Sequence, residues 1–115
     1  MAIKDIQAQD LRELIRTKGE NLEIIDVRQP EEYDIIHIRG SKLIPMNELQ
    51  GRLSEIDWGK EVVFICRSGS RSKLMASIVA QGRDVDNLRY GIYECFADGQ
   101  GENLEIDERA IGTYF

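Results

Sequence analysis

Short apolar runs alternate with amphipathic segments along the chain, and this alternation predicts a sheet covered by helices. The runs at 22–26 and 62–65 are short and largely apolar, as expected of strands buried on both faces. Segments 9–18 and 73–80 instead repeat their apolar residues at helical spacing. Because strands that alternate with helices favour parallel pairing, we expect an α/β fold. It should have an open, parallel five-stranded sheet with helices on both faces.

Weaker signals define the other expected elements. Short strands are expected at 1–5, 43–44 and 85–88. Pro30 favours the first turn of a short helix. Asn47 is expected to cap another helix, which extends through about Leu53. Gly82 is expected to end the helix at 73–80 as a left-handed C′ glycine.

The composition limits the classes of function. The chain has 115 residues, enough for one domain, and its net charge of −6 argues against a nucleic-acid binder. No apolar stretch reaches about 18 residues and the N-terminus lacks the pattern of a secretory signal. We therefore expect a cytoplasmic protein without a membrane span. Two cysteines, Cys66 and Cys95, and one histidine predict neither a disulfide framework nor a zinc site.

A cysteine stands where a predicted strand meets a predicted helix. Cys66 follows the strand at 62–65, and six small or cationic residues separate it from the helix. The free N–H groups of such a loop attract anions, and Arg67 and Arg71 add two positive charges. These surroundings favour the thiolate, which is the nucleophilic form of cysteine. A buried structural cysteine is the alternative, and the basic loop makes us prefer a nucleophile.

The loop and three other segments resemble a known family. Cys66-Arg67-Ser68-Gly69-Ser70-Arg71-Ser72 resembles the active-site loop of the rhodanese family of sulfurtransferases. Segments 25–33, 37–45 and 87–92 are similar to family segments in the family order, so the resemblance covers about residues 3–98. It implies that Cys66 is the catalytic nucleophile and that Arg71 stabilises the transition state or a persulfide. The implied substrate-binding residues are Arg67, Ser68, Gly69, Ser70 and Ser72.

Two supporting residues are expected near the carboxyl end of the strand at 22–26. Asp26 ends this strand, and ligands of open α/β sheets gather at that edge. Asp26 either helps to order the site or caps the following turn. Arg28 and Glu32 are expected to pair with each other or with the loop, as structural supports.

The resemblance implies a sulfurtransferase that moves sulfane sulfur from a donor such as thiosulfate to a thiophilic acceptor through a Cys66 persulfide. A small anionic donor suits a basic loop in an acidic protein, and a protein thiol or sulfur carrier is the expected acceptor. No cofactor and no metal is implied. One alternative is a non-catalytic interaction or sensor module. The other is a cysteine-based phosphatase, whose arginine lies six positions after the cysteine, whereas Arg71 lies five after Cys66.

Three features lie outside the family pattern. We expect residues 1–99 to form the rhodanese-like domain and residues 100–115 to be a C-terminal extension that packs on it or trails it. Tyr90 stands where the family has a glycine, so the turn there is expected to differ. Cys95 stands where a tryptophan is usual. We expect a core cysteine, and a resolving thiol for Cys66 is the alternative.

Overall fold

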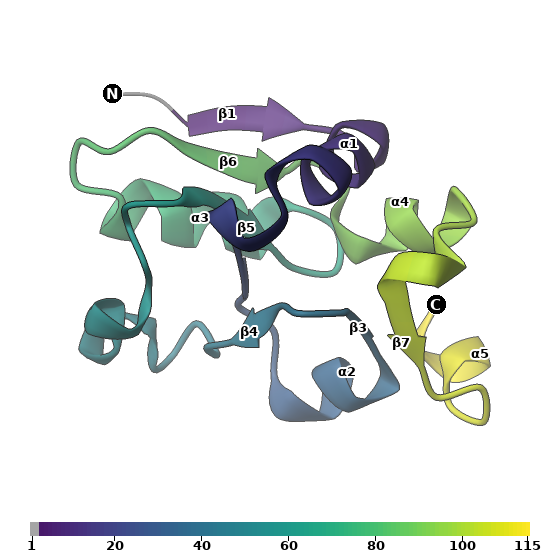
Figure 1. Ribbon diagram of the computed structural model, residues 1–115. Helices are drawn as coiled ribbons and strands as arrows, with labels where there is room; N and C mark the ends of the chain where they lie inside the picture. Colours follow the sequence, from purple (N-terminus) through teal and green to yellow (C-terminus); the bar gives the residue numbers. More distant parts are fainter. Residues whose placement is uncertain (1–2) are drawn as a thin grey trace.

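The computed structural model describes residues 3–115, which contain a five-stranded parallel sheet (Figure 1). Across the sheet the strands are β1 (Ile3–Ile6), β6 (Val85–Leu88), β5 (Glu61–Ile65), β2 (Leu22–Asp26) and β4 (Lys42–Leu43). β2 pairs with β5 along its whole length. This sheet confirms the predicted α/β fold. Met1 and Ala2, which belong to the first predicted strand, lie outside the described residues.

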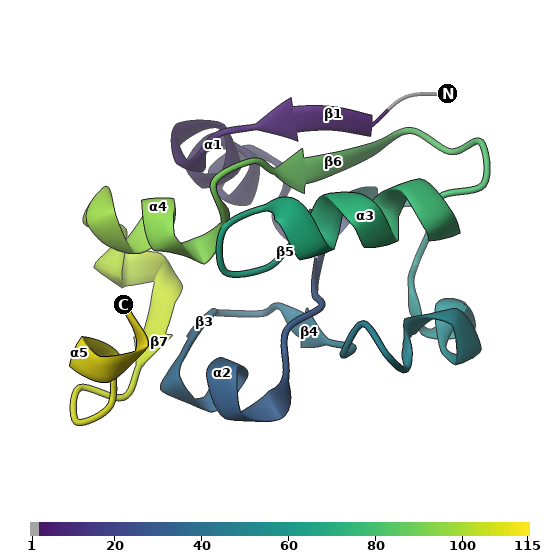
Figure 2. The same cartoon turned by 180° about the vertical axis from the view of Figure 1, so that it is seen from behind.

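Helices cover both faces of the sheet, as predicted. They are α1 (Ala8–Lys18), α3 (Ser70–Val79) and α4 (Gly91–Ala97). α3 covers the face seen in Figure 2, and α1 and α4 pack on the other face. Along β5, Val62 and Phe64 join the core under α3, whereas Val63 and Ile65 join the core under α1 and α4. Both faces of β5 are therefore buried, which explains its continuous apolar run.

A second, two-stranded sheet joins the middle of the chain to its C-terminus. The chain leaves β2 through α2 (Pro30–Ile35), which begins at the predicted proline, and continues into β3 (Ile36–Ile38). β3 pairs antiparallel with β7 (Leu104–Ile106), and α5 (Ile111–Tyr114) follows. Short 3-10 turns precede β2 and β7, namely η1 (Gly19–Asn21) and η4 (Gly101–Asn103). The last residues thus lie next to α2, as Figure 1 shows.

The helix predicted from Asn47 through Leu53 is wrong. The structure has two 3-10 turns there, η2 (Leu49–Gly51) and η3 (Leu53–Glu55). Arg52, between them, has φ −127° and ψ 21°, which interrupts the helical repeat. Leu49 is nevertheless fully buried in the core under α3. The apolar side chains therefore reach the core from short turns, without a regular helix.

The end of α3 differs from the prediction by one residue. α3 ends at Val79 with Ala80 as its C-cap, so the C′ position belongs to Gln81. Gln81 has φ 50° and Gly82 has φ 87°. Two consecutive left-handed residues therefore turn the chain toward β6, and Gly82 is the second of them.

Candidate active site

Cys66 follows β5 and lies at the N-terminus of α3, as predicted. Its side chain is fully buried, with 0% exposed. Cys66 Sγ accepts a hydrogen bond from the Gly69 N–H at 3.0 Å and lies 3.3 Å from the Ser72 hydroxyl. Gly69 is the N-cap of α3, so this backbone donor belongs to the turn that opens the helix. Such donors stabilise a thiolate or a negatively charged sulfur attached to it.

The loop around Cys66 packs closely against the connection between β6 and α4. Gly69 has φ 100°, and a Cβ atom there would lie 1.8 Å from the carbonyl oxygen of Arg89. Gly91 has φ 70°, and a Cβ atom there would lie 2.2 Å from the carbonyl oxygen of Arg67. Only glycine fits either position, so these two approaches fix the shape of the loop.

The turn at Tyr90 does not require a second glycine. Tyr90 itself has φ −105°, a value that suits a residue with a side chain, in line with the expectation that tyrosine avoids positive φ. Gly91 alone carries the left-handed conformation. The next N–H, of Ile92, donates to the Cys66 carbonyl at 2.9 Å. The Tyr90 ring is exposed, with the guanidinium of Arg89 5.3 Å from its centroid.

A chain of polar side chains runs from Cys66 into the sheet. The Ser72 hydroxyl donates to Asn87 Oδ1 at 2.6 Å, and the same hydroxyl oxygen lies 3.3 Å from the sulfur and 3.2 Å from the Gly69 carbonyl oxygen. The Asn87 amide donates in turn to the Gly69 carbonyl at 3.3 Å and to Asp5 at 3.2 Å. Asn87 was not among the site residues predicted from the sequence. Its only local signal was a polar residue in a buried strand.

Arg71 reaches toward Glu32 of α2 and makes two hydrogen bonds with its carboxylate, at 2.8 and 2.9 Å. Burial opposes ionisation of Glu32, but the hydrogen bonds from Arg71 and Tyr114 outweigh it and lower its pKa to about 2. The Arg71 side chain is 33% exposed and interacts electrostatically with Cys66. Glu32 therefore pairs with the loop, which was one of the two predicted arrangements.

Asp26 and Arg28 form a fully buried ion pair beside the loop. Arg28 Nε donates to Asp26 Oδ1 at 2.9 Å, and Nη2 donates to Oδ2 at 2.8 Å. The Arg28 backbone N–H also donates to Asp26 Oδ1 at 3.0 Å. Asp26 thus caps the turn, as one of the two predicted roles requires, and it also holds the Arg28 guanidinium. The carboxylate that pairs with Arg28 belongs to Asp26, and Glu32 contributes only its backbone carbonyl.

Arg67 faces the C-terminal residues. Its Nη2 donates to the Tyr114 carbonyl at 3.1 Å, and its guanidinium carbon lies 5.3 Å from the Tyr114 ring centroid and 5.4 Å from that of Phe115. These contacts hold the cation by a hydrogen bond and by stacking on aromatic faces. Sequence reasoning found Arg67 but missed Tyr114, because nothing local links residues so far apart along the chain.

Ser68 and Ser70 lie on the outer side of the loop. Both are exposed, and they border a pocket of about 330 Å³ that Lys73 and Arg89 also line. Cys66 does not line this pocket. Of the predicted substrate-binding residues, the structure therefore brings Gly69 and Ser72 to the sulfur and directs these two serines outward.

Cys95 and the single histidine, His37, have structural surroundings. Cys95 is a free thiol buried in the core under α1 and α4, on the opposite face of the sheet from Cys66. Burial raises its pKa to about 12, which disfavours the thiolate that a resolving cysteine needs. His37 stacks on Tyr33 at 3.9 Å, and its Nδ1 lies 2.8 Å from the Tyr33 carbonyl oxygen.

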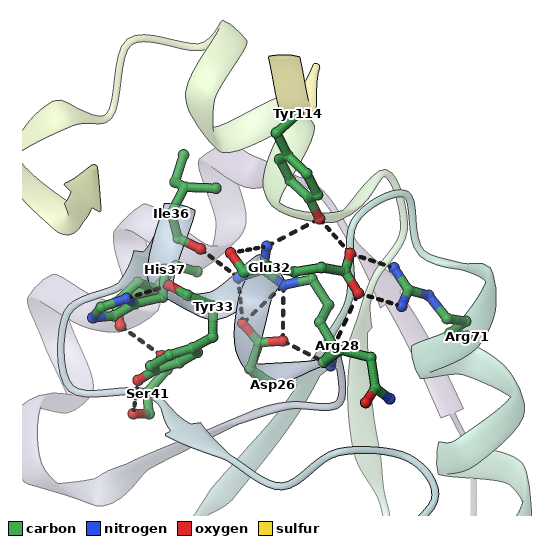
Figure 3. A network of polar contacts seen from close by, with 11 residues as sticks. Asp26, Arg28, Glu32, Tyr33, Ile36, His37, Ser41, Arg71 and Tyr114 are labelled. Carbon is green, nitrogen blue, oxygen red and sulfur yellow. Dashed lines mark hydrogen bonds and ion pairs between the residues drawn. The ribbon is translucent and has the colours of Figure 1, made fainter. Parts of the chain in front are cut away.

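Residues 3–115 contain no cluster of three or more histidine, cysteine or acidic side chains suited to a metal ion. Within the same residues, no helix has the length and apolar character needed to cross a membrane. Glu32 accepts hydrogen bonds from Arg71 and Tyr114, and Arg28 donates to Tyr114, as Figure 3 shows.

A cysteine sulfur enclosed by a glycine-containing loop, between a parallel strand and a helix N-terminus, defines a class of α/β domains with a buried cysteine at the carboxyl edge of the sheet. The chain belongs to the family described as the rhodanese-like domain, whose model matches residues 7–98. A solved structure described as a rhodanese-like domain protein from Staphylococcus aureus is 28% identical, with a TM-score of 0.75. That similarity covers 90% of this chain and 98% of the other.

Similar proteins include several with sulfur-related names. The putative sulfurtransferase YtwF of Bacillus subtilis is 42% identical over 72 residues, which are 63% of this chain and 69% of that protein. The thiosulfate:glutathione sulfurtransferase of Saccharomyces cerevisiae is 29% identical over 118 aligned positions, covering 90% of this chain and 85% of that protein. The putative sulfur carrier protein YrkF of Bacillus subtilis is 44% identical over 57 residues, half of this chain. The chain therefore belongs to a family that contains sulfurtransferases.

Some relatives are much longer than this chain. The match covers 31% of YrkF. It covers 23% of the probable adenylyltransferase/sulfurtransferase MoeZ of Mycobacterium tuberculosis, which is 36% identical over 92 residues, 76% of this chain. This chain thus spans less than a third of the length of these two relatives.

Proposed function

We propose that the protein is a sulfurtransferase that carries sulfane sulfur as a persulfide on Cys66. One observation carries the proposal: the Cys66 sulfur accepts the Gly69 N–H at 3.0 Å at the N-terminus of α3. A sulfur placed among backbone donors is suited to hold a further, negatively charged sulfur atom. The sulfurtransferase names of the relatives support the same chemistry.

In the first step the Cys66 thiolate attacks the outer sulfur of a donor such as thiosulfate. A new S–S bond forms on Cys66, the S–S bond of thiosulfate breaks, and sulfite leaves with the electron pair. Arg67 and Arg71 would attract the dianionic donor and orient it. Because Cys66 is fully buried, a donor reaches the sulfur only when side chains at the loop move aside.

In the second step a thiophilic acceptor takes the terminal sulfur. With cyanide, a C–S bond forms, the S–S bond breaks, thiocyanate leaves and the Cys66 thiolate returns. In the cell a protein thiol or a sulfur carrier would be the acceptor. The loop N–H groups would stabilise the charge on the terminal sulfur, and Arg71 would act beside it. Asp26 and Arg28 would support the site through their buried pair.

Intact mass after incubation with thiosulfate tests the proposal. We expect a gain of about 32 Da, one sulfur atom, that maps to Cys66 and is erased by cyanide. Cys66→Ser should abolish both the gain and thiocyanate formation, because the nucleophile is lost. Cys95→Ala is the matched control and should still gain sulfur, since Cys95 lies in the opposite core layer.

Two results would contradict the proposal. One is sulfur transfer that survives in the Cys66→Ser variant. The other is the absence of a persulfide with both thiosulfate and a cysteine persulfide donor, while Cys66 is free to react with an alkylating reagent. The same preparation should leave p-nitrophenyl phosphate intact, and its hydrolysis would favour a phosphatase.

A further inference from the structure

We propose that Tyr114 is a positioning residue that holds Arg71 at the Cys66 loop by way of Glu32. Tyr114 belongs to residues 104–115, which we name the C-terminal strap. The inference deepens the proposed function and rests on it, because it concerns how the site receives an anionic sulfur donor. Figure 3 shows the three side chains in one network.

The C-terminal strap is fixed to the domain before it reaches the site. β7 pairs with β3, and the backbone N–H of Asp107 donates to the Ile35 carbonyl at 2.7 Å. At the other end the Phe115 ring packs against Tyr93 and Phe96 of α4, with centroids 5.2 Å apart in each pair. These contacts place Tyr114 between α2 and α4 and limit its movement.

The Tyr114 hydroxyl has a defined direction. It donates to Glu32 Oε2 at 2.6 Å and accepts from Arg28 Nη1 at 3.1 Å. An arginine can only donate, so the single phenol proton is available for Glu32. Burial first, and then the bond to Glu32, raise the pKa of Tyr114, which keeps the phenol protonated. Arg28 is itself held by its ion pair with Asp26, so the Tyr114 hydroxyl accepts its hydrogen bond from a fixed side chain.

Glu32 transmits this position to Arg71. Its Oε2 also accepts from Arg71 Nη2, and its Oε1 accepts from Arg71 Nη1 and from the Gln29 N–H at 3.1 Å. Both carboxylate oxygens are therefore held from two sides. Within residues 3–115 the remaining N–H groups of Arg71 have no hydrogen-bond partner. A guanidinium fixed in this way, close to Cys66 and with donors to spare, is preorganised for an anion.

Loss of the hydroxyl should weaken this preorganisation. Without its bond to Tyr114, Glu32 keeps its charge but can shift, and the Arg71 guanidinium shifts with it. The Glu32 carboxylate would also have one hydrogen-bond partner fewer, so it would attract Arg71 more strongly. Both effects reduce the attraction between Arg71 and an anion at Cys66, and neither affects a neutral reagent.

Selective alkylation of Cys66 tests the inference with Tyr114→Phe. The Cys66 thiolate displaces iodide from anionic iodoacetate or from neutral iodoacetamide, and peptide mapping reports each rate constant at Cys66. We expect Tyr114→Phe to lower the iodoacetate-to-iodoacetamide ratio roughly three- to tenfold, the effect typical of one lost hydrogen bond. The KM for thiosulfate should rise by a similar factor.

Tyr93→Phe is the matched control. Tyr93 belongs to the same aromatic cluster, but its hydroxyl has no hydrogen-bond partner among the described residues. The same substitution there should leave the alkylation ratio unchanged. A double-mutant cycle adds the connection through Glu32: in the Glu32→Gln background, Tyr114→Phe should have less than half of its effect.

The inference is overturned if Tyr114→Phe leaves the ratio unchanged, or if its effect is fully additive with Glu32→Gln. Alkylation does not depend on sulfur transfer, so it separates this inference from the proposed function. If Cys66 forms a persulfide while the ratio is insensitive to Tyr114, the positioning role alone fails. If no persulfide forms in the parent protein, the sulfurtransferase proposal fails instead.

Discussion

Single atoms set the shape of the loop that surrounds the Cys66 sulfur. Gly69, Gly82 and Gly91 all have positive φ, but their surroundings differ. A Cβ atom would collide with a backbone carbonyl at Gly69 and Gly91, whereas Gly82 has open space around that position. Backbone strain alone acts at Gly82, and strain and collision act together at Gly69. Glycine is therefore needed at Gly82 for its backbone conformation, and at Gly69 also because there is no space for a Cβ atom.

We predict that Gly69→Ala is clearly more destabilising than Gly82→Ala. The Gly82 variant should lower the free energy of unfolding by about 1 kcal/mol, the typical cost of a left-handed alanine. The Gly69 variant should lose about 2–4 kcal/mol, because the Arg89 backbone must also move. Urea denaturation, analysed with a common m-value, measures both losses. Equal losses would show that the predicted collision is relieved at no cost.

At the scale of elements, one buried arginine connects segments that lie apart in the sequence. Arg28 donates to Asp26 at the end of β2, to the Ile36 carbonyl at the start of β3 and to Tyr114 of α5. Its charge is offset by Asp26, and both side chains are fully buried. Removal of one partner would leave the other charge buried without compensation, which proteins tolerate poorly.

Arg28→Leu should therefore reduce the free energy of unfolding by about 3–5 kcal/mol, because the Asp26 carboxylate is left unpaired. The double variant Asp26→Asn/Arg28→Leu should recover part of this loss, since it buries no charge. Arg39→Leu is the control: Arg39 pairs with Glu105 at the surface, and its loss should cost less than about 1 kcal/mol. Chemical denaturation compares the three. An Arg28 variant as stable as the Arg39 variant would refute this role.

At the scale of the whole molecule, the protein is acidic, with a net charge of −6. One of its carboxylic acids, Asp86, is buried where ionisation is unfavourable. Asp86 of β6 is buried beside Glu61 of β5, and its Oδ2 has no hydrogen-bond partner within the described part of the chain. Burial and the neighbouring Glu61 raise the pKa of Asp86 to about 7, while Lys4 opposes the shift and Asp10 adds to it.

This position predicts how stability depends on pH. Because the pKa of Asp86 is higher in the folded state than the ordinary 3.8, folding favours the protonated form. The contribution is fully present below pH 3.8 and is lost as the pH rises through about 7. Over this pH range, the free energy of unfolding of Asp86→Asn should fall by about 1–2 kcal/mol less than that of the parent protein, a figure already discounted for solvent screening.

Thermal or urea unfolding at several pH values between acidic and neutral gives the slope of the free energy of unfolding against pH for Asp86→Asn. Asp34→Asn serves as the control, because Asp34 is an exposed carboxylate of α2. The control should keep the slope of the parent protein. An Asp86→Asn variant with that same slope would mean that Glu61 or another group holds the proton.

Prediction from the sequence failed where a weak local signal competed with tertiary packing. Pro30 fixed the start of α2 through its own backbone, so that prediction succeeded. The segment from Asn47 had a suitable cap and apolar spacing, yet it forms 3-10 turns. Its leucines needed only to reach the core, and a short segment gains too little from α-helical bonds to enforce regularity.

By itself the sequence determined the α/β pattern, the buried strand β5, and Cys66 at the start of α3. These follow from periodicity, apolar runs and loop chemistry, which act between neighbours in the chain. Only the tertiary structure decided that Tyr114 binds Glu32, 82 residues away, and that Arg67 stacks on the C-terminal rings. It also placed Asn87 beneath the loop. Contacts between distant segments leave no periodic signal, so the support of the thiol became visible only once the chain was folded.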